Sequence, residues 1–289
     1  MLIIRLKAGL GNQMFQYAFG RVLSLQRNEE LFLDLSAYEN IADRDTPREY
    51  KLDNFNIKAK KASQEQVAPY ITKLQILKRK IERNLFYRNN YKYHRYITNS
   101  KSEYFEGWWQ NEEYFVHHAD IIRSELSLKE PLSTPARSIS QSIDGAQKEG
   151  SITVSIHVRR GDYVTNPFAA TFHGVVDIAY YEKAIAEMHS RFPEKKLVFF
   201  IFSDDINWAR ENIIKNENSV YVSGPDIAYY EEIHLMSLCD HHIIANSSFS
   251  WWGAWLNPKQ SKVVIAPSKW ANDTSIDTSS ATPPSWIRI

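Results

Sequence analysis

The chain has 289 residues, with 35 Lys and Arg against 34 Asp and Glu, so its net charge is close to zero. Its length allows one large domain or two of ordinary size. The balanced charge excludes a global field that would attract nucleic acid or membrane, so any anion site must be local. The single cysteine, Cys239, excludes an intramolecular disulfide framework, fits a reducing compartment and lies at a packed helix position.

The first half predicts a strand, a glycine turn, a helix and a second strand, followed by shorter elements. The expected strands are 2–6, 31–35 and 104–106, and the expected helices are 14–25, 64–83 and 112–126. The polar stretch from Pro131 to Gly150 is the best linker candidate. The N-terminus reads as a strand and not as a signal peptide, and no apolar run approaches the roughly 20 residues that span a bilayer. A soluble, cytoplasmic protein is expected.

The second half alternates strands and helices more regularly. The expected strands are 152–158, 197–202, 220–222, 242–245 and 263–266, and the expected helices are 178–191, 206–214, 227–238 and 249–256. Such alternation predicts a parallel sheet with right-handed crossovers. The last twenty or so residues are expected to form an irregular tail. The predicted fold is therefore α/β, with domains over 1–148 and 149–289.

The stretch from Lys73 to Arg95 is basic and also carries an apolar stripe. Its cations are Lys73, Lys78, Arg79, Lys80, Arg83, Arg88, Lys92 and Arg95, and its apolar residues include Ile71, Leu74, Leu77, Ile81 and Leu85. One interpretation is a patch for an anionic membrane surface, at the inner face of the membrane, or for an acidic glycan. The other is the solvated face of an ordinary amphipathic helix.

Polar clusters follow three predicted strands of the second half. They are Arg159-Arg160 with Asp162, then Ser203-Asp204-Asp205, then Asn246-Ser247-Ser248-Phe249 where a helix begins. In open parallel sheets, ligands gather beyond the carboxyl ends of the strands. Adjacent arginines are costly in a core, and their planar donors match phosphate oxygens. The clusters therefore predict a diphosphate site.

Several of these residues also have a purely structural interpretation. Asp205 and Ser247 or Ser248 could merely cap helices. His157 could stack on a nucleoside or belong to a buried network, and Asp204 or Asp205 could accept from the edge of guanine. Arg160 is expected to pair with a carboxylate such as Asp162 and to hold the loop.

The turn at Gly9-Leu10-Gly11, with Asp34 closing the second strand, resembles a dinucleotide fingerprint, but Met14 occupies the third glycine position. The turn lets the backbone approach a ligand, with Asn12 and Gln13 facing it.

The sequence contains no convincing set of metal ligands. The tripeptide Asp43-Arg44-Asp45 lies in a polar loop and not after an apolar strand. The neighbouring histidines 117–118 and 241–242 point apart on any regular element. No metal site is predicted.

Taken together, five motifs in order along nearly the whole chain resemble the bacterial α-1,2-fucosyltransferases of glycosyltransferase family 11. They are Gly9 to Ala18, Gly107-Trp108-Trp109-Gln110 with Tyr114-Phe115, His157 to Tyr163, Ser203-Asp204-Asp205, and Asn246 to Leu256. Trp108 stands where tyrosine is common. The resemblance implies two facing Rossmann-like domains of the GT-B type, the first on the acceptor side and the second binding the donor.

The resemblance also implies an activity: transfer of L-fucose from GDP-β-L-fucose to the 2-hydroxyl of a terminal galactose, with inversion and without a metal or other cofactor. A galactose-terminated glycan or O-antigen precursor is the expected acceptor. The implied donor-binding residues are Gly11, His157, Arg159, Ser203, Asp204, Asp205, Ser247, Ser248 and Phe249. The implied acceptor-binding residues are Asn12, Gln13, Trp109 and His173.

The expected mechanism is a single displacement in which Arg159 and the amides of 247–249 stabilise charge on the departing diphosphate. Asn12 matches an asparagine that more distant fucosyltransferases need. The general base is open among Asp162, His173 and Asp177. The rival interpretations are another GDP-sugar transferase, a dinucleotide oxidoreductase and a noncatalytic glycan-binding protein.

Overall fold

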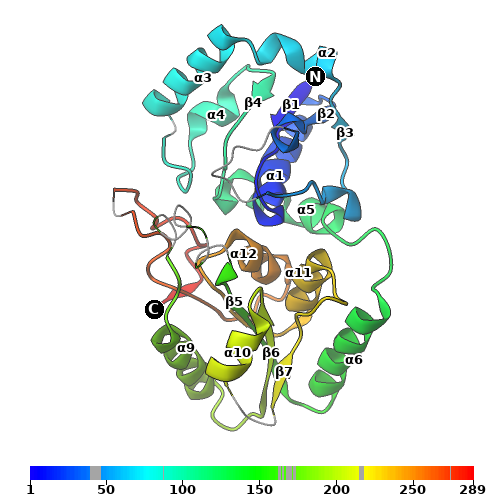
Figure 1. Ribbon diagram of the computed structural model, residues 1–289, viewed down its shortest axis with the longest axis vertical. Coiled ribbons are helices and arrows are strands. Elements are labelled where there is room, and N and C mark those ends of the chain that lie inside the picture. The colour runs from blue at the N-terminus through cyan, green and yellow to red at the C-terminus, as the bar shows by residue number, and fades with distance from the viewer. Residues whose placement is uncertain are drawn as a thin grey trace. The chain divides into compact units, whose positions relative to one another are not determined.

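The computed structural model describes residues 1–39, 47–86, 88–161, 164, 166, 171, 174–214, 218–273 and 275–289. The chain divides into two compact units, each built on a parallel sheet (Figure 1). Unit 1 comprises residues 1–129 and 276–283, and unit 2 comprises residues 130–275 and 284–289.

Unit 1 is built on a four-stranded sheet in the order β3-β2-β1-β4. Its strands, all parallel, are β1 (Leu2–Arg5), β2 (Leu31–Asp34), β3 (Lys60–Lys61) and β4 (Tyr104–Phe105). Helix α1 (Leu10–Arg27) connects the first two strands and ends at Asn28, which adopts the left-handed conformation that terminates helices. A Cβ on Gly20 would lie 2.4 Å from Ile4, so glycine is required where α1 packs on the sheet.

The other elements of unit 1 are short. The helices are α2 (Gln64–Val67), α3 (Lys73–Phe86), α4 (Arg95–Asn99) and α5 (Ala119–Glu125), with 3₁₀ turns at Ser36–Tyr38, Leu52–Asn54, Ala68–Tyr70, Glu112–Tyr114 and Val116–His118. The single helix predicted over 64–83 is wrong. Pro69 sits in the 3₁₀ turn that separates α2 from α3, because proline cannot continue an α-helix.

Unit 2 is built on a six-stranded sheet in the order β10-β9-β8-β5-β6-β7. The strands, all parallel, are β5 (Ile152–Val158), β6 (Leu197–Ser203), β7 (Ser219–Tyr221), β8 (His241–Ile243), β9 (Val264–Ala266) and β10 (Ile287–Arg288). The helices are α6 (Thr134–Lys148), α9 (Ile178–Arg191), α10 (Ile206–Asn212), α11 (Tyr229–Leu238) and α12 (Ser248–Leu256). This is the strand order of the doubly wound dinucleotide-binding fold.

Both faces of β5 are buried, although its alternating hydrophobic pattern alone predicts that only one face is buried. Val154, Ile156 and Val158 join the core formed with α9 and β6. The alternate residues Thr153 and Ser155 are also buried, but they hydrogen bond to Asp240 and His242. The polar half of the alternation is therefore a buried hydrogen-bonded face and not a solvated one.

Two predictions about chain organisation are wrong. The predicted linker up to residue 150 contains α6, because Ser133 caps the helix and Pro135 fits its first turn. The boundary between the units accordingly lies at 129/130 and not at 148/149. The C-terminal tail is largely irregular as expected, but it ends in β10, which pairs with β9.

No helix among the described residues is long and apolar enough to cross a membrane. Cys239 is fully buried at the end of α11, as expected, and burial raises the pKa of its thiol.

Candidate active site

The carboxyl edge of the unit 2 sheet has a point where the strand order reverses. Strand β5 lies between β6, the next strand along the chain, and β8, which the chain reaches only after β7. Successive connections leave β5 in opposite directions at this point, and such switch points open a crevice for ligands. The predicted clusters at 157–160 and 246–249 directly follow these two neighbouring strands.

Arg159 emerges from the end of β5 and pairs with Asp204 at the end of β6. The Nη1 of Arg159 lies 2.7 Å from Oδ2 of Asp204, and both side chains are about one fifth exposed. A Cβ on Gly161 would lie 2.2 Å from the same carboxylate oxygen, so glycine at 161 lets the carboxylate reach the arginine. The structure thus brings together two residues that lie 45 positions apart and were predicted to hold different parts of a nucleotide.

The neighbouring residues fix the turn after β6. The amide of Arg160 donates to Asp204 (2.8 Å), and the Nε of Arg160 lies 3.4 Å from Asp205. The guanidinium of Arg160 also stacks 4.0 Å above the Trp208 ring. Arg160 therefore holds a loop as predicted, but its carboxylate partner is Asp205. Asp162, the partner named from the sequence, lies outside the described residues.

Asp205 and Ser203 serve the turn itself. Asp205 accepts from the amide of Trp208 at the start of α10, which is the capping role considered from the sequence. Ser203 accepts from the amide of Asp205 through its hydroxyl, and its own amide donates to the hydroxyl of Ser223. Both predicted donor-binding residues are thus already engaged within the turn, as Asp204 is with Arg159, and the side chains of Asp204 and Asp205 are 24% and 40% exposed.

His157 is the buried polar residue at the end of β5. It is 3% exposed, its ring lies 5.3 Å from that of Phe249, and its backbone carbonyl accepts from Tyr181. Burial and then the charge of Arg159 lower the pKa of His157 to about 3. Its Nδ1 has no hydrogen-bond partner among the described residues. A neutral imidazole with a free ring nitrogen fits a hydrogen bond to a heterocycle better than a structural network.

Helix α12 supplies the second side of this edge. Ser247 caps the helix by accepting from the amide of Phe249, while Ser248 and Phe249 are half-buried. The body of the helix is anchored by Trp251, whose ring contacts those of Trp255 and Trp286. Rigid anchoring leaves the first-turn amides at a fixed position where the helix dipole favours an anion.

The buried carboxyl group of Glu232 contacts the turn after β6 through Ser223. Glu232 on α11 is 8% exposed and hydrogen bonds to Ser223, whose hydroxyl also receives the Ser203 amide. Burial, reinforced by the charge of Asp204, raises the pKa of Glu232 to about 8. The sequence does not single out Glu232, because an acid inside an amphipathic helix gives no sign that it points inward.

In unit 1, the glycine turn after β1 positions Asn12 but buries Gln13. Asn12 is half-buried and accepts from the side chain of Gln110 (2.5 Å). Gln13 is fully buried, donates to the carbonyls of Ala8 and Glu49, and accepts from Lys51. The prediction that Gln13 faces an acceptor is therefore corrected, because its amide holds the segment 47–51 in place.

Two further predicted ligand contacts in unit 1 are core residues. Trp109 is 4% exposed and stacks on Phe19 with ring centres 4.2 Å apart. Its predicted contact with the acceptor is corrected accordingly. Gly11 is also buried, within the first turn of α1.

Asp34 does not suit a dinucleotide. It is 1% exposed, and it accepts from the hydroxyl of Tyr104 and the amide of Ser36. An acid engaged in this way is poorly placed to bind a ribose, which speaks against the oxidoreductase interpretation.

A charged group beside the glycine turn was missed from the sequence. Glu106 lies 3.3 Å from Lys7 and 3.4 Å from Arg5, and Lys7 sits 4.5 Å above the ring of Trp108. The pKa of Glu106 is lowered because these cations outweigh its burial, and burial lowers the pKa of Lys7. Their positions in the sequence could have pointed to them, since Lys7 lies shortly before the motif that begins at Gly9 and Glu106 directly precedes the motif that begins at Gly107.

The general base stays open. Asp177 caps α9 by accepting from Tyr180 (2.9 Å), whereas Asp162 and His173 lie outside the described residues. Asp43 and Asp45 also lie outside the described residues. Among the residues that are described, no group of three or more His, Cys, Asp or Glu side chains could hold a metal ion.

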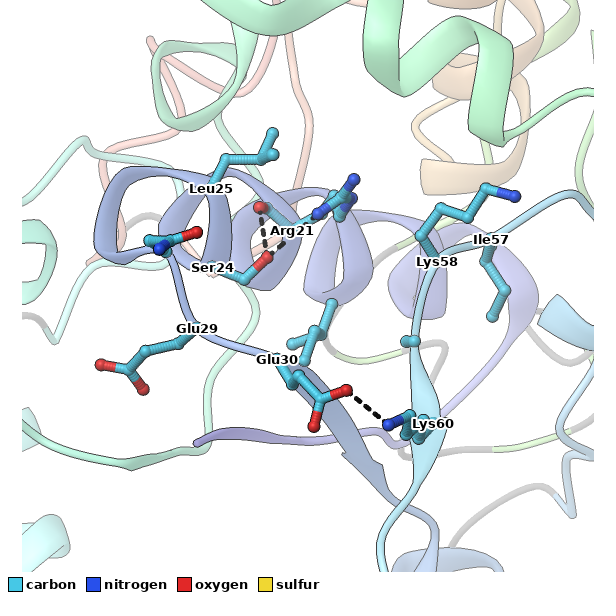
Figure 2. Close-up of a pocket in the computed structure, with 11 residues that line it drawn as sticks. Arg21, Ser24, Leu25, Glu29, Glu30, Ile57, Lys58 and Lys60 are labelled. Atoms are coloured by element: carbon cyan, nitrogen blue, oxygen red, sulfur yellow. Dashed lines mark hydrogen bonds and ion pairs between the residues drawn. The ribbon is translucent and has the colours of Figure 1, made fainter.

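A hollow of about 550 Å³ lies elsewhere in unit 1, where α1 ends (Figure 2). Its lining includes Arg21, Leu25 and Lys58, and Glu30 and Lys60 point toward one another at its edge. It sits at the amino ends of the strands, opposite the edge where parallel sheets bind ligands, so it is not part of the candidate site.

The comparisons with known proteins agree with this geometry. The model of "Glycosyl transferase family 11" matches residues 1–289. An α-1,2-colitosyltransferase of Escherichia coli is 35% identical over 305 residues, covering 100% of this chain and 99% of the relative. The O-antigen biosynthesis glycosyltransferase WbnK of Escherichia coli is 34% identical over 304 residues, covering 98% and 99%.

The structure of NodZ α-1,6-fucosyltransferase co-crystallized with GDP, a Bradyrhizobium protein, has a TM-score of 0.50 at 13% identity and covers 89% of this chain and 92% of its own. That likeness extends to the fold alone. Parallel α/β units with a switch-point site and a whole-chain family match define a glycosyltransferase. The chain belongs to glycosyltransferase family 11, as its motifs indicate.

Proposed function

We propose that this enzyme transfers a 6-deoxy-L-sugar from a GDP-activated donor to the 2-hydroxyl of a terminal galactose in a glycan, with inversion and without a metal ion. The observation that carries the proposal is the family match over the whole chain, together with relatives whose names specify an α-1,2 linkage. An O-antigen precursor as acceptor is supported by the similarity to WbnK.

The donor is assigned to the carboxyl edge of unit 2. Arg159 would bind the β-phosphate, the amides at the start of α12 would bind the diphosphate, and the free Nδ1 of His157 would meet the guanine. Asp204, which pairs with Arg159, is the acid proposed to accept from the guanine edge.

The reaction is a displacement at C1 of the donor sugar. As the bond to the diphosphate oxygen breaks, negative charge grows on the β-phosphate, and the acceptor hydroxyl loses its proton as it attacks. Arg159 and the α12 amides would stabilise that charge in the transition state, where a divalent metal serves in other transferases. Asn12, held by Gln110, would orient the acceptor.

Two donor sugars are in competition. Family resemblance favours L-fucose, whereas the 35% identical relative is named for colitose. Colitose is L-fucose without the 3-hydroxyl, so both share the 6-methyl group and differ at one polar contact. A site built to hydrogen bond a hydroxyl strongly rejects the analogue that lacks it, so turnover with the two donors separates these functions.

The test is incubation of the full chain with GDP-fucose or GDP-colitose and a panel of β-galactosides, in buffer containing EDTA. We expect a product with one added deoxysugar, joined by an α-1,2 linkage that methylation analysis and NMR identify. Turnover of GDP-mannose alone, another linkage, or complete loss of turnover in EDTA would overturn the proposal. Binding of galactosides without any turnover would favour the noncatalytic alternative.

A further inference from the structure

Helix α3 turns its apolar stripe away from unit 1. All residues of α3 are described, and none of them is buried. Leu74, Leu77, Ile81 and Leu85 form one stripe at helical spacing, and their exposed fractions lie between 50% and 75%. An ordinary amphipathic helix buries such a stripe in the core of its own domain. The interpretation of this segment as an ordinary amphipathic helix therefore does not account for the exposed stripe.

The face that α3 turns toward the unit is polar. Arg79 donates to the carbonyl of Tyr70 (2.6 Å) and stacks 4.6 Å from the Tyr104 ring. Gln75, Glu82 and Arg83, which lie within one side of the helix, are its other half-buried residues. Arg79 thus contacts unit 1 through one aromatic ring and one backbone carbonyl, and the apolar residues of the helix are left for another contact.

Positive charge borders the exposed stripe. At 100° per residue, Lys78 lies on one side of the stripe, and Lys73 and Lys80 lie on the other. Between residues 73 and 95 there are eight Lys and Arg against one acid, Glu82, in a chain whose overall charge is balanced. Phe86, the last residue of α3, and Tyr96 of α4 are exposed and stack with ring centres 4.5 Å apart.

We propose that this surface, defined by the apolar stripe of α3 and its flanking lysines, docks on an anionic lipid membrane. Lipid tails would receive the leucine and isoleucine side chains, and anionic headgroups would pair with the lysines. Aromatic residues such as Phe86 and Tyr96 suit the boundary between them. An acidic glycan or a nucleic acid offers charge but no apolar phase, so neither accounts for the stripe.

The test is flotation of the full chain with vesicles of phosphatidylcholine alone or with 30% phosphatidylglycerol. We expect at least tenfold stronger partitioning into the anionic vesicles, with binding that weakens as salt rises. The double variant Leu77→Gln/Ile81→Gln and the double variant Lys73→Glu/Lys80→Glu should each weaken it at least tenfold. Matched controls, Ile121→Gln and Lys195→Glu/Lys196→Glu, alter exposed residues elsewhere and should stay within twofold.

Three outcomes would overturn the proposal. Wild-type protein could fail to float with anionic vesicles. Leu77→Gln/Ile81→Gln could convert a concentration-dependent oligomer into a monomer in light scattering without changing flotation, which would make a second copy the occupant. The same variant could lower Tm by more than about 5 °C, which would mean that the chain itself covers the stripe. Turnover with soluble galactosides should be unchanged in every variant, so this test is independent of the proposed activity.

Discussion

At the scale of single residues, the candidate donor site depends on the shape of one guanidinium group. Arg159 meets Asp204 through Nη1 at 2.7 Å, and the planar shape of its guanidinium group matches the oxygens of a phosphate. Arg159→Lys keeps the charge but loses this planar shape. We expect turnover at saturating substrates to fall about 100- to 1000-fold, or ~3–4 kcal/mol, as when one oxyanion donor is lost. Arg191→Lys, on the exposed end of α9, should leave turnover unchanged, and near wild-type activity in Arg159→Lys would refute the assignment.

A second prediction at this scale concerns Glu232. Because its folded pKa of about 8 lies above its ordinary 4.5, folding favours the protonated acid. Its contribution to stability is therefore fully present below about pH 4.5 and is lost as pH rises toward 8, by roughly 1.4 kcal/mol per pH unit. We expect Glu232→Gln to remove this loss. Urea unfolding at pH 5 and pH 8 should show the difference between variant and wild type shifting in favour of the variant at pH 8, and an unchanged difference would exclude a buried acid.

At the scale of elements, one carboxylate ties two helices together. Glu231 on α11 accepts from the amide and hydroxyl of Ser133, which caps α6, and from the amide of Ala228 at the start of its own helix. Glu231→Ala leaves these donors without an acceptor, so we expect the free energy of unfolding to fall by about 1–3 kcal/mol. Glu182→Ala, on the exposed face of α9, is the matched control and should change it by less than about 0.5 kcal/mol. Equal effects in the two variants would contradict the proposed role.

Elements with strong periodicity were predictable, and those that depend on tertiary contacts were not. The helix predicted over 178–191 and the strand predicted over 152–158 have the observed bounds. Helix α6 was missed because its polar sequence reads as a linker, and its stability comes from the Ser133 cap and contacts with α11. The position of Arg159 and Asp204 after two strands predicts that they lie at one sheet edge, where they form an ion pair, but nothing local in the sequence shows that Gln13 and Trp109 are buried.

At the scale of the whole molecule, the chain passes between its two units three times, because the segment 276–283 returns to unit 1 before β10 completes the unit 2 sheet. Lys92 pairs with Asp277 in unit 1 at 2.9 Å, and both side chains are about half exposed. Trp286, just before β10, packs on Trp251 of α12 with ring centres 5.4 Å apart. The tail that was expected to be irregular thus contributes to both units, through an exposed ion pair in unit 1 and through the packing of Trp286 in unit 2.

This distribution predicts different effects for two changes in the tail. Deletion of residues 284–289 removes β10 and the Trp286 ring that helps to anchor α12, so we expect a clear drop in Tm and a weaker affinity for GDP, because the helix start loses its fixed position. Asp277→Asn breaks only an exposed ion pair, and both quantities should stay near wild type. Differential scanning fluorimetry and calorimetric titration with GDP measure the two effects. A deletion that matched the point variant in both would show that the α12 anchor does not depend on the C-terminal strand.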